Sequence, residues 1–165
     1  MNIAIIPARI GSKRIRKKNI RKFNGKPIIE YTIELLIKMK LFNKIIISSD
    51  STKILRLLDK YKKFSICEPF LRSKKLGGNL IGTRAVIIDV LKKNNLNKKY
   101  NIFCVYPTSI FLKKKYINQS LKLIKNKKTD YLFSAKMVDR NLLRSFTYKK
   151  KKVALLFKQN YKKRT

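Results

Sequence analysis

A loop rich in basic residues follows the first apolar run of the sequence, Ile3–Ile6. Within this loop, Gly11 and Ser12 can expose backbone N–H groups that curl around an anion. Four basic side chains stand around them: Arg9, Lys13, Arg14 and Lys18. Arginine contacts phosphate oxygens in pairs, lysine adds a mobile charge, and fixed cations stabilise a leaving pyrophosphate. The loop therefore predicts a site for the phosphates of a nucleoside triphosphate, and the alternative is an ordinary basic loop in a lysine-rich chain.

Two later apolar runs are also followed by polar segments. Ser48–Asp50 follows the run Ile45–Ile47, and Pro107–Ser109 follows the run Ile102–Tyr106. In an open parallel sheet, ligands bind beyond the carboxyl ends of the strands. We therefore expect these segments and the basic loop to form one site. The loop lacks the Gly-Lys-Ser/Thr ending of a P-loop and the three-glycine dinucleotide pattern.

Strand-like and helix-like segments alternate along the chain. Short apolar runs predict strands at Ile3–Ile6, Ile45–Ile47, Ile102–Tyr106 and Tyr131–Ala135, with an edge strand at Val153–Phe157. Helical spacing predicts helices over Pro27–Met39, Ile54–Tyr61, Thr83–Lys93 and Tyr116–Lys125, and Phe64–Gly82 is expected to be irregular. Pro7 should end the first strand, and Asp50 or Ser51 should cap the second helix. The alternation predicts an α/β fold, with a Rossmann-like, mostly parallel sheet flanked by helices.

The composition argues against a membrane-spanning, a secreted and a nucleic-acid-binding protein. No apolar run reaches the roughly 18 residues that a membrane span needs. The N-terminus lacks the basic region of a signal peptide, so we expect a cytoplasmic protein. The net charge of +35 favours anionic ligands, but the lysines occur in every segment with many asparagines and isoleucines, as AT-rich codons would produce. A nucleic-acid-binding role is therefore the weaker alternative.

The two cysteines, Cys67 and Cys104, lie in apolar surroundings far apart in the sequence. They are expected to be buried thiols. A zinc site is not expected, because the chain has no histidine and no paired cysteines.

The basic loop belongs to a longer series of motifs. The motifs, in order, are Ile6–Ile20 (IPARIGSKRIRKKNI), Asn24–Ile29 (NGKPII), Ile47–Asp50 (ISSD), Pro69–Arg72 (PFLR), Tyr106–Thr108 (YPT) and Asp130–Ser134 (DYLFS). Together they resemble the signature of the CMP-sialic acid synthetase family, and most closely its pseudaminic acid cytidylyltransferase branch. Kdo cytidylyltransferases resemble this fold but carry an Asp at the position that aligns with Thr108. Because this chain has no such Asp, the resemblance favours the sialate and pseudaminate branches of the family.

This resemblance implies a reaction in which CTP and an acidic nine-carbon sugar give the CMP-sugar and pyrophosphate, with Mg²⁺ assistance. It implies nucleotide-binding roles for Ala8, Arg9, Gly11, Ser12, Lys13, Lys18, Asn19 and Arg72. Arg9 and Lys18 would also be the catalytic cations. The acceptor sugar would be bordered by Tyr106, Pro107, Thr108 and Ser109. Members of the family of full length are expected to form homodimers.

Several positions depart from the pattern of the family. The family usually has Pro at the position of Arg16 and often Gly at that of Ile10, and it tends to carry acidic residues where this chain has Gly77-Gly78-Asn79. Relatives continue beyond the position of Thr165 into a Tyr-His-Asp segment that supplies metal-binding acid. We therefore expect a single nucleotidyltransferase domain over residues 1–165, incomplete at its C-terminus, whose metal ligands are unknown. An inactive nucleotide-binding remnant of the family is the main alternative.

Overall fold

The computed structural model describes residues 1–12, 15–78, 80–97, 99–125, 131–135, 146–149 and 152–156. The chain divides into two compact units, Met1–Gln119 and Ser120–Thr165. Each unit is described by itself. The prediction of a single domain stays a prediction.

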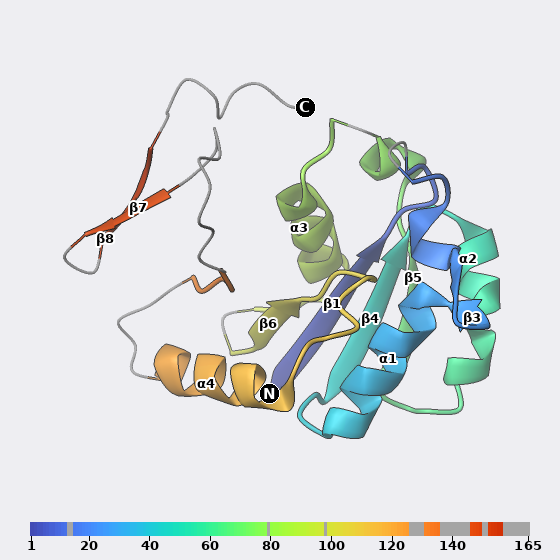
Figure 1. Ribbon diagram of the computed structural model, residues 1–165. Helices are drawn as coiled ribbons and strands as arrows, with labels where there is room; N and C mark the ends of the chain where they lie inside the picture. Colours follow the sequence, from blue (N-terminus) through green and yellow to red (C-terminus); the bar gives the residue numbers. More distant parts are fainter. Residues whose placement is uncertain are drawn as a thin grey trace. The chain divides into compact units, whose positions relative to one another are not determined.

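The first unit is built on a four-stranded parallel sheet (Figure 1). Its strands are β1 (Asn2–Ala8), β4 (Lys44–Ser49), β5 (Cys67–Leu71) and β6 (Asn101–Cys104). They are arranged in the order β5-β4-β1-β6, and every pair is parallel. The apolar runs in β1 and β4 form these central strands because both of their faces are covered. The predicted α/β fold with a parallel sheet is thereby confirmed.

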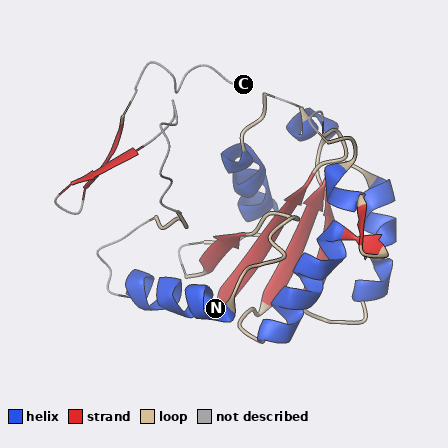
Figure 2. Ribbon diagram, in the orientation of Figure 1, coloured by secondary structure: helices blue, strands red, loops and turns tan. Residues whose placement is uncertain are grey.

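Helices cover both faces of the sheet (Figure 2). The α-helices are α1 (Ile28–Met39), α2 (Thr52–Leu57), α3 (Thr83–Lys93) and α4 (Lys114–Lys125). The 3₁₀ turns are η1 (Lys18–Ile20), η2 (Asp59–Tyr61) and η3 (Lys74–Gly77). A small hairpin pairs β2 (Lys22–Phe23) with β3 (Lys26–Pro27), directly before α1. Pro27 precedes the first residue of α1, close to its predicted place in the first turn.

Alternate residues of the central strands fill two core layers. Ile3, Ile5 and Ile46 form a buried cluster with Val90 of α3. Because successive strand residues point to opposite faces, Ala4 and Ile6 face the other side, where α1 lies (Figure 1). The buried residues of that helix include Ile29, Ile33 and Leu36.

The sequence predicted that Pro7 ends the first strand. This prediction is wrong, because β1 continues to Ala8. The carbonyl of Ile5 accepts a hydrogen bond from the Val105 N–H at 3.0 Å, so Ile5 directs its backbone groups toward β6. The backbone nitrogen of Pro7, two residues later, points to the same side, toward β6. Because β6 ends at Cys104, opposite Ile5, the missing N–H of Pro7 costs no ladder hydrogen bond.

The sequence predicted that Phe64–Gly82 is irregular. This prediction is wrong for part of the segment, because the segment contains strand β5. This strand includes Glu68 and Pro69, which hide the apolar pattern of a buried strand. It lies at the edge of the sheet and pairs only with β4, a position where proline is tolerated.

The prediction of a strand at Tyr131–Ala135 is also wrong. These residues have no strand structure, and Tyr131 is 80% exposed. In the second unit, β7 (Phe146–Lys149) and β8 (Lys152–Leu155) form an antiparallel hairpin. The predicted edge strand therefore exists from Val153 to Leu155, whereas Phe157 lies outside the described residues.

The two cysteines have different surroundings. Cys67, at the start of β5, is buried as predicted, whereas Cys104, at the end of the edge strand β6, is exposed. Burial disfavours the thiolate and raises the pKa of Cys67 from 9.0 to about 11.

Stability should therefore fall as the pH rises from about 9 to 11. The unfolded chain loses the Cys67 proton first, so ionisation favours unfolding by up to about 3 kcal/mol across this window. Urea titrations at pH 8, 9, 10 and 11 measure the effect. The Cys67→Ala variant should lose less stability over the same interval, and equal slopes for the two proteins would contradict a buried thiol.

Candidate functional site

The basic loop begins where β1 ends, at the carboxyl edge of the sheet (Figure 1). Ala8 is fully buried, backbone included, so the predicted nucleotide-binding role of this residue is not available in this arrangement, whereas Gly11 is exposed and Arg9 and Ser12 are half-buried. The Ser12 N–H donates to the carbonyl of Ile10 at 3.0 Å, which turns the chain tightly after Ile10. Lys13 lies outside the described residues.

The second half of the loop returns through η1. Lys18 is exposed, but its neighbour Asn19 is only 5% exposed. The Asn19 Nδ2 donates to the carbonyl of Arg9 at 2.8 Å. Asn19 thus ties the two halves of the loop together, and in this arrangement its role is to shape the loop.

Asp50 follows β4 and reaches the loop from the neighbouring strand. Its Oδ1 accepts a hydrogen bond from the Ile10 N–H at 3.0 Å. Of the two expected cap residues, Ser51 takes the N-cap position of α2 and Asp50 does not, and no side chain makes a capping hydrogen bond there. The register explains the difference, because Ala8 lies opposite Ser49, which places the next residues of both strands side by side.

Arg72 follows β5 at the same edge. Its side chain is 2% exposed, and its Nη2 lies 3.9 Å from Asp50 Oδ1. Its Nη1 donates to the Ser48 carbonyl at 2.5 Å, while its buried Nε has no hydrogen-bond partner. Burial lowers the pKa of Arg72, Asp50 and Asp89 oppose that shift, and Arg9 adds to it, so Arg9 and Arg72 lie within electrostatic reach.

The segment after β6 reaches the same edge from the other side of β1. Pro107 is buried, and its carbonyl accepts a hydrogen bond from Thr32 Oγ1 of α1 at 2.8 Å. Tyr106 is 53% exposed, and its hydroxyl lies 3.2 Å from Thr83 Oγ1 at the start of α3. Thr108 and Ser109 are half-buried. The structure thus places this segment and the basic loop at neighbouring strand ends, as the sequence predicted.

The loop also forms a hollow of about 500 Å³. It is lined by Arg16, Lys17, Ile20 and Arg21. Arg21 was not singled out from the sequence, although its charge was visible there. The three basic side chains of this hollow are exposed, and its lining includes none of the residues that meet at the strand ends, so the hollow is assigned no part in that site.

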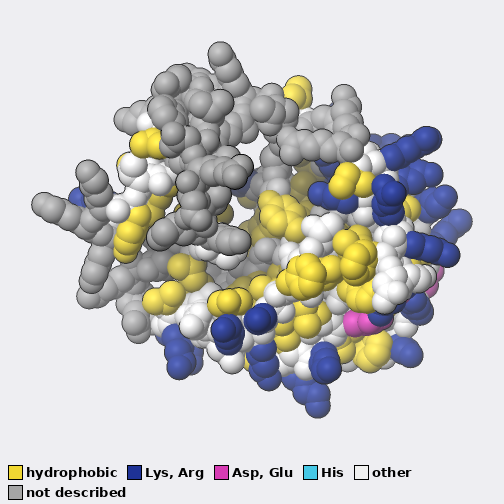
Figure 3. Space-filling view, viewed as in Figure 1, with side chains coloured by type: hydrophobic (Ala, Val, Ile, Leu, Met, Phe, Trp, Pro, Cys, Tyr) yellow, Lys and Arg dark blue, Asp and Glu magenta, His cyan; other side chains and the backbone are white. Residues whose placement is uncertain are grey.

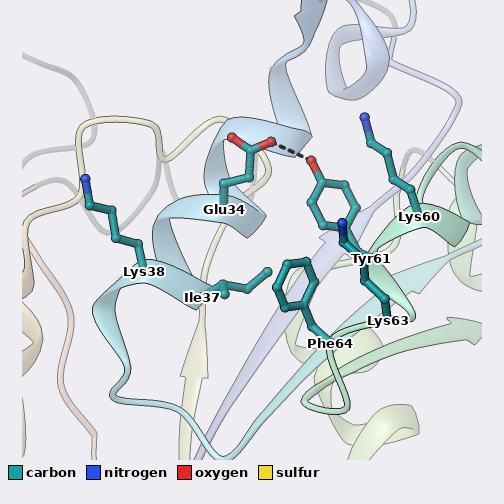
Figure 4. Close-up of a pocket in the computed structure, with 7 residues that line it drawn as sticks. All are labelled: Glu34, Ile37, Lys38, Lys60, Tyr61, Lys63 and Phe64. Carbon is teal, nitrogen blue, oxygen red and sulfur yellow. Dashed lines mark hydrogen bonds between the residues drawn. The ribbon is translucent and has the colours of Figure 1, made fainter.

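A second hollow, of about 330 Å³, lies between α1 and the segment around η2 (Figure 4). Tyr61 donates to Glu34 Oε1 at 2.7 Å and to the buried Glu30 at 3.1 Å, and Glu30 also pairs with Lys60 at 2.5 Å. These contacts fasten α1 to η2. The hollow lies on the helical layer and shares no residue with the strand-end site, so we assign it no part in that site.

The described residues do not fit a magnesium site. No three Asp, Glu, His or Cys side chains stand together within that part of the chain. The carboxylates near the site, Asp50 and Asp89, both act on the Arg72 guanidinium, and Asp50 also holds the Ile10 N–H. No reaction step is therefore assigned to a metal.

Basic side chains of the described residues are spread over several parts of the face shown in Figure 3 and do not form a single stripe. This distribution agrees with the spread of lysines along the sequence. None of the helices that the structure describes has the length and apolar character needed to span a membrane.

Solved structures with a similar fold include two synthetases. A CMP:2-keto-3-deoxy-manno-octonic acid synthetase complexed with CTP superposes with a TM-score of 0.61 at 13% identity, covering 76% of this chain and 47% of that one. A 4-diphosphocytidyl-2C-methyl-D-erythritol synthase superposes with a TM-score of 0.56 at 15% identity, covering 76% and 55%. The chain thus spans about half the length of these structures. They show a shared fold.

Sequence comparison adds the family. A pseudaminic acid cytidylyltransferase of Campylobacter jejuni is 32% identical over 168 residues, which cover 99% of this chain and 71% of the relative. An N-acylneuraminate cytidylyltransferase of Escherichia coli is 32% identical over 122 residues, covering 73% of this chain and 27% of the relative. The sequence profile described as cytidylyltransferase matches residues 3–164. The chain therefore belongs to the cytidylyltransferase family.

Proposed function

We propose that this protein transfers a cytidylyl group from CTP to an acidic nine-carbon sugar, pseudaminic or N-acylneuraminic acid. The observation that carries the proposal is the basic loop after β1, which Asn19 and Asp50 hold at the edge of the sheet that Arg72 and Tyr106 also reach. Membership of the cytidylyltransferase family and 32% identity to a pseudaminic acid cytidylyltransferase support it.

The loop after β1 would bind the triphosphate. The exposed Gly11 N–H would donate to phosphate oxygens, and the Ser12 N–H would join it only after leaving the Ile10 carbonyl. Arg9 and Lys18 would neutralise the charge that develops on the leaving pyrophosphate. Lys13 is assigned to the same role by its position in the motif. Asn19 would act through the Arg9 carbonyl.

The segment Tyr106–Ser109 would border the acceptor sugar. The anomeric hydroxyl of the sugar attacks the α-phosphorus of CTP, a new P–O bond forms, and the bond to the β-phosphate oxygen breaks. Pyrophosphate leaves with the electron pair of that bond, and the hydroxyl proton passes to solvent. The exposed Tyr106 and half-buried Thr108 and Ser109 offer hydroxyl groups that can orient the sugar.

Arg72 needs a different role from simple contact. Because its side chain is 2% exposed, it can meet the nucleotide only after a local rearrangement that frees its guanidinium from Ser48. We therefore assign Arg72 to the floor of the nucleotide site. A magnesium requirement, cytoplasmic location and a homodimer are further proposals from the family resemblance.

A coupled pyrophosphate assay tests the function. The chain should release pyrophosphate only when CTP and pseudaminic or N-acylneuraminic acid are both present, and ATP, GTP or UTP should not replace CTP. The same assay with EDTA decides the magnesium requirement. If CTP raises the melting temperature but no pyrophosphate appears, the protein binds nucleotide without transferring it; if RNA binds tightly at moderate salt and CTP has no effect, the proposal is wrong.

A further inference from the structure

Asp50 stands out because it is an acidic residue at the base of a basic site. The chain has 8 acidic and 43 basic residues, and the Asp50 side chain is only 9% exposed. An anionic side chain beside a site for an anion lowers the electrostatic affinity of that site. Its presence there calls for a structural reason.

The contacts of Asp50 join three strand ends. Through Oδ1 it accepts the Ile10 N–H from the loop after β1, and the same oxygen faces the Arg72 guanidinium that follows β5. Arg72 is itself held by the Ser48 carbonyl of β4 and by its own backbone N–H, which donates to the Ser49 carbonyl at 2.8 Å. One carboxylate oxygen, Oδ1, therefore meets both the loop and the buried guanidinium and links the two.

Gly77 packs directly against the other face of this carboxylate. A Cβ atom added at Gly77 would lie 2.0 Å from Asp50 Oδ2 and 2.8 Å from its Cγ. No side chain fits at that distance, so the last residue of η3 leaves room for Asp50 only because it is glycine. In the sequence, Gly77 stands out only as part of the run Gly77-Gly78-Asn79 at a position where the family tends to carry acidic residues, whereas the structure shows a close approach to Asp50.

We infer that Asp50 is a positioning residue that sets the conformation of the phosphate-binding loop by accepting the Ile10 N–H, with Arg72 and Gly77 holding its carboxylate in place. This inference rests on the proposed function for its consequence, CTP binding, but its geometric part is independent of the ligand. The hydrogen bond from Ile10 acts on the loop directly, whereas the 3.9 Å ion pair with Arg72 acts on it only through Asp50, so we expect the acceptor to matter more than the charge.

Two substitutions at Asp50 separate the acceptor from the charge. Asp50→Asn keeps an oxygen at Oδ1 and removes the charge, whereas Asp50→Ala removes both. In Asp50→Ala, the Ile10 amide of the 165-residue chain should exchange with solvent about tenfold faster in NMR hydrogen-exchange measurements, and the Kd for CTP should rise about tenfold. Asp50→Asn should keep both values within about threefold of the wild type.

A matched pair of glycine variants tests the packing. Gly77→Ala should displace Asp50 and reproduce the fast Ile10 exchange of Asp50→Ala. Gly82→Ala should not, because a Cβ at Gly82 meets nothing within 4 Å. Melting temperatures of all variants separate local effects from loss of folding.

These measurements test the positioning role of Asp50 separately from the proposed function. Slow Ile10 exchange in a folded Asp50→Ala protein would overturn the positioning role, and so would equal damage from Asp50→Asn and Asp50→Ala, which would mean that the charge matters. If the wild-type chain binds no CTP, the proposed function fails, yet the exchange of the Ile10 amide still decides the role of Asp50.

Discussion

Replacing Arg9 with alanine should raise the Kd for CTP about tenfold to a hundredfold, since a hydrogen bond to a charged group contributes about 1.5–3 kcal/mol. Arg9 directly follows β1, and its carbonyl is held by Asn19, so its backbone stays in place when the side chain is removed. Pyrophosphate release should fall further, by about a hundredfold to a thousandfold, if Arg9 stabilises the leaving group. Isothermal titration with CTP and the pyrophosphate assay measure the two effects.

Arg56→Ala is the matched control for this experiment. Arg56 lies exposed in the last turn of α2, so its removal lowers the net charge by the same single unit. It should leave the Kd for CTP nearly unchanged. Equal weakening by the two substitutions would mean that CTP responds to overall charge and not to the loop.

The core variant Ile46→Ala should lose about 3 kcal/mol of unfolding free energy and about 10 °C of melting temperature. Ile46 is fully buried in β4, where it packs with Ile3, Ile5 and Val90. Truncation removes three carbon atoms from a site covered by a strand on each side and by α3. The surrounding backbone is held by parallel ladders, so it can close little of the resulting cavity.

Urea denaturation measures the loss, and Ile46→Val provides the calibration. The valine variant removes one methylene and should cost about 1 kcal/mol. If Ile46→Ala lost less than the valine variant, β4 would not be the centre of the core. If it failed to fold, the valine variant would still report the packing around position 46.

The central part of the fold could be predicted from the sequence because its signals are local. The isoleucines of β1 and β4 form continuous apolar runs, and the helix over Thr83–Lys93 has the predicted bounds. The strand β5 could not be recognised, because Pro69 and Glu68 are acceptable only at a sheet edge, and edge position is a property of the assembled sheet.

For the candidate site, too, one part could be predicted from the sequence and another part could not. The basic loop and Tyr106–Ser109 each follow a strand of a parallel sheet, so the sequence predicted that both lie at the same edge. The contact between Asp50 and Ile10 joins residues 40 positions apart and depends on the register of β1 against β4. The burial of Arg72 likewise depends on residues far away in the sequence, Ser48 and Asp50. No local pattern predicts either contact.

The most direct test of cytidylyl transfer is ³¹P NMR of the protein mixed with CTP, Mg²⁺ and pseudaminic acid, with N-acylneuraminic acid in a parallel sample. We expect the three CTP signals to be replaced, in one of the two samples, by a phosphodiester signal of a CMP-sugar and an equimolar amount of pyrophosphate. Unchanged CTP in both samples, with the protein folded throughout, would contradict the assignment.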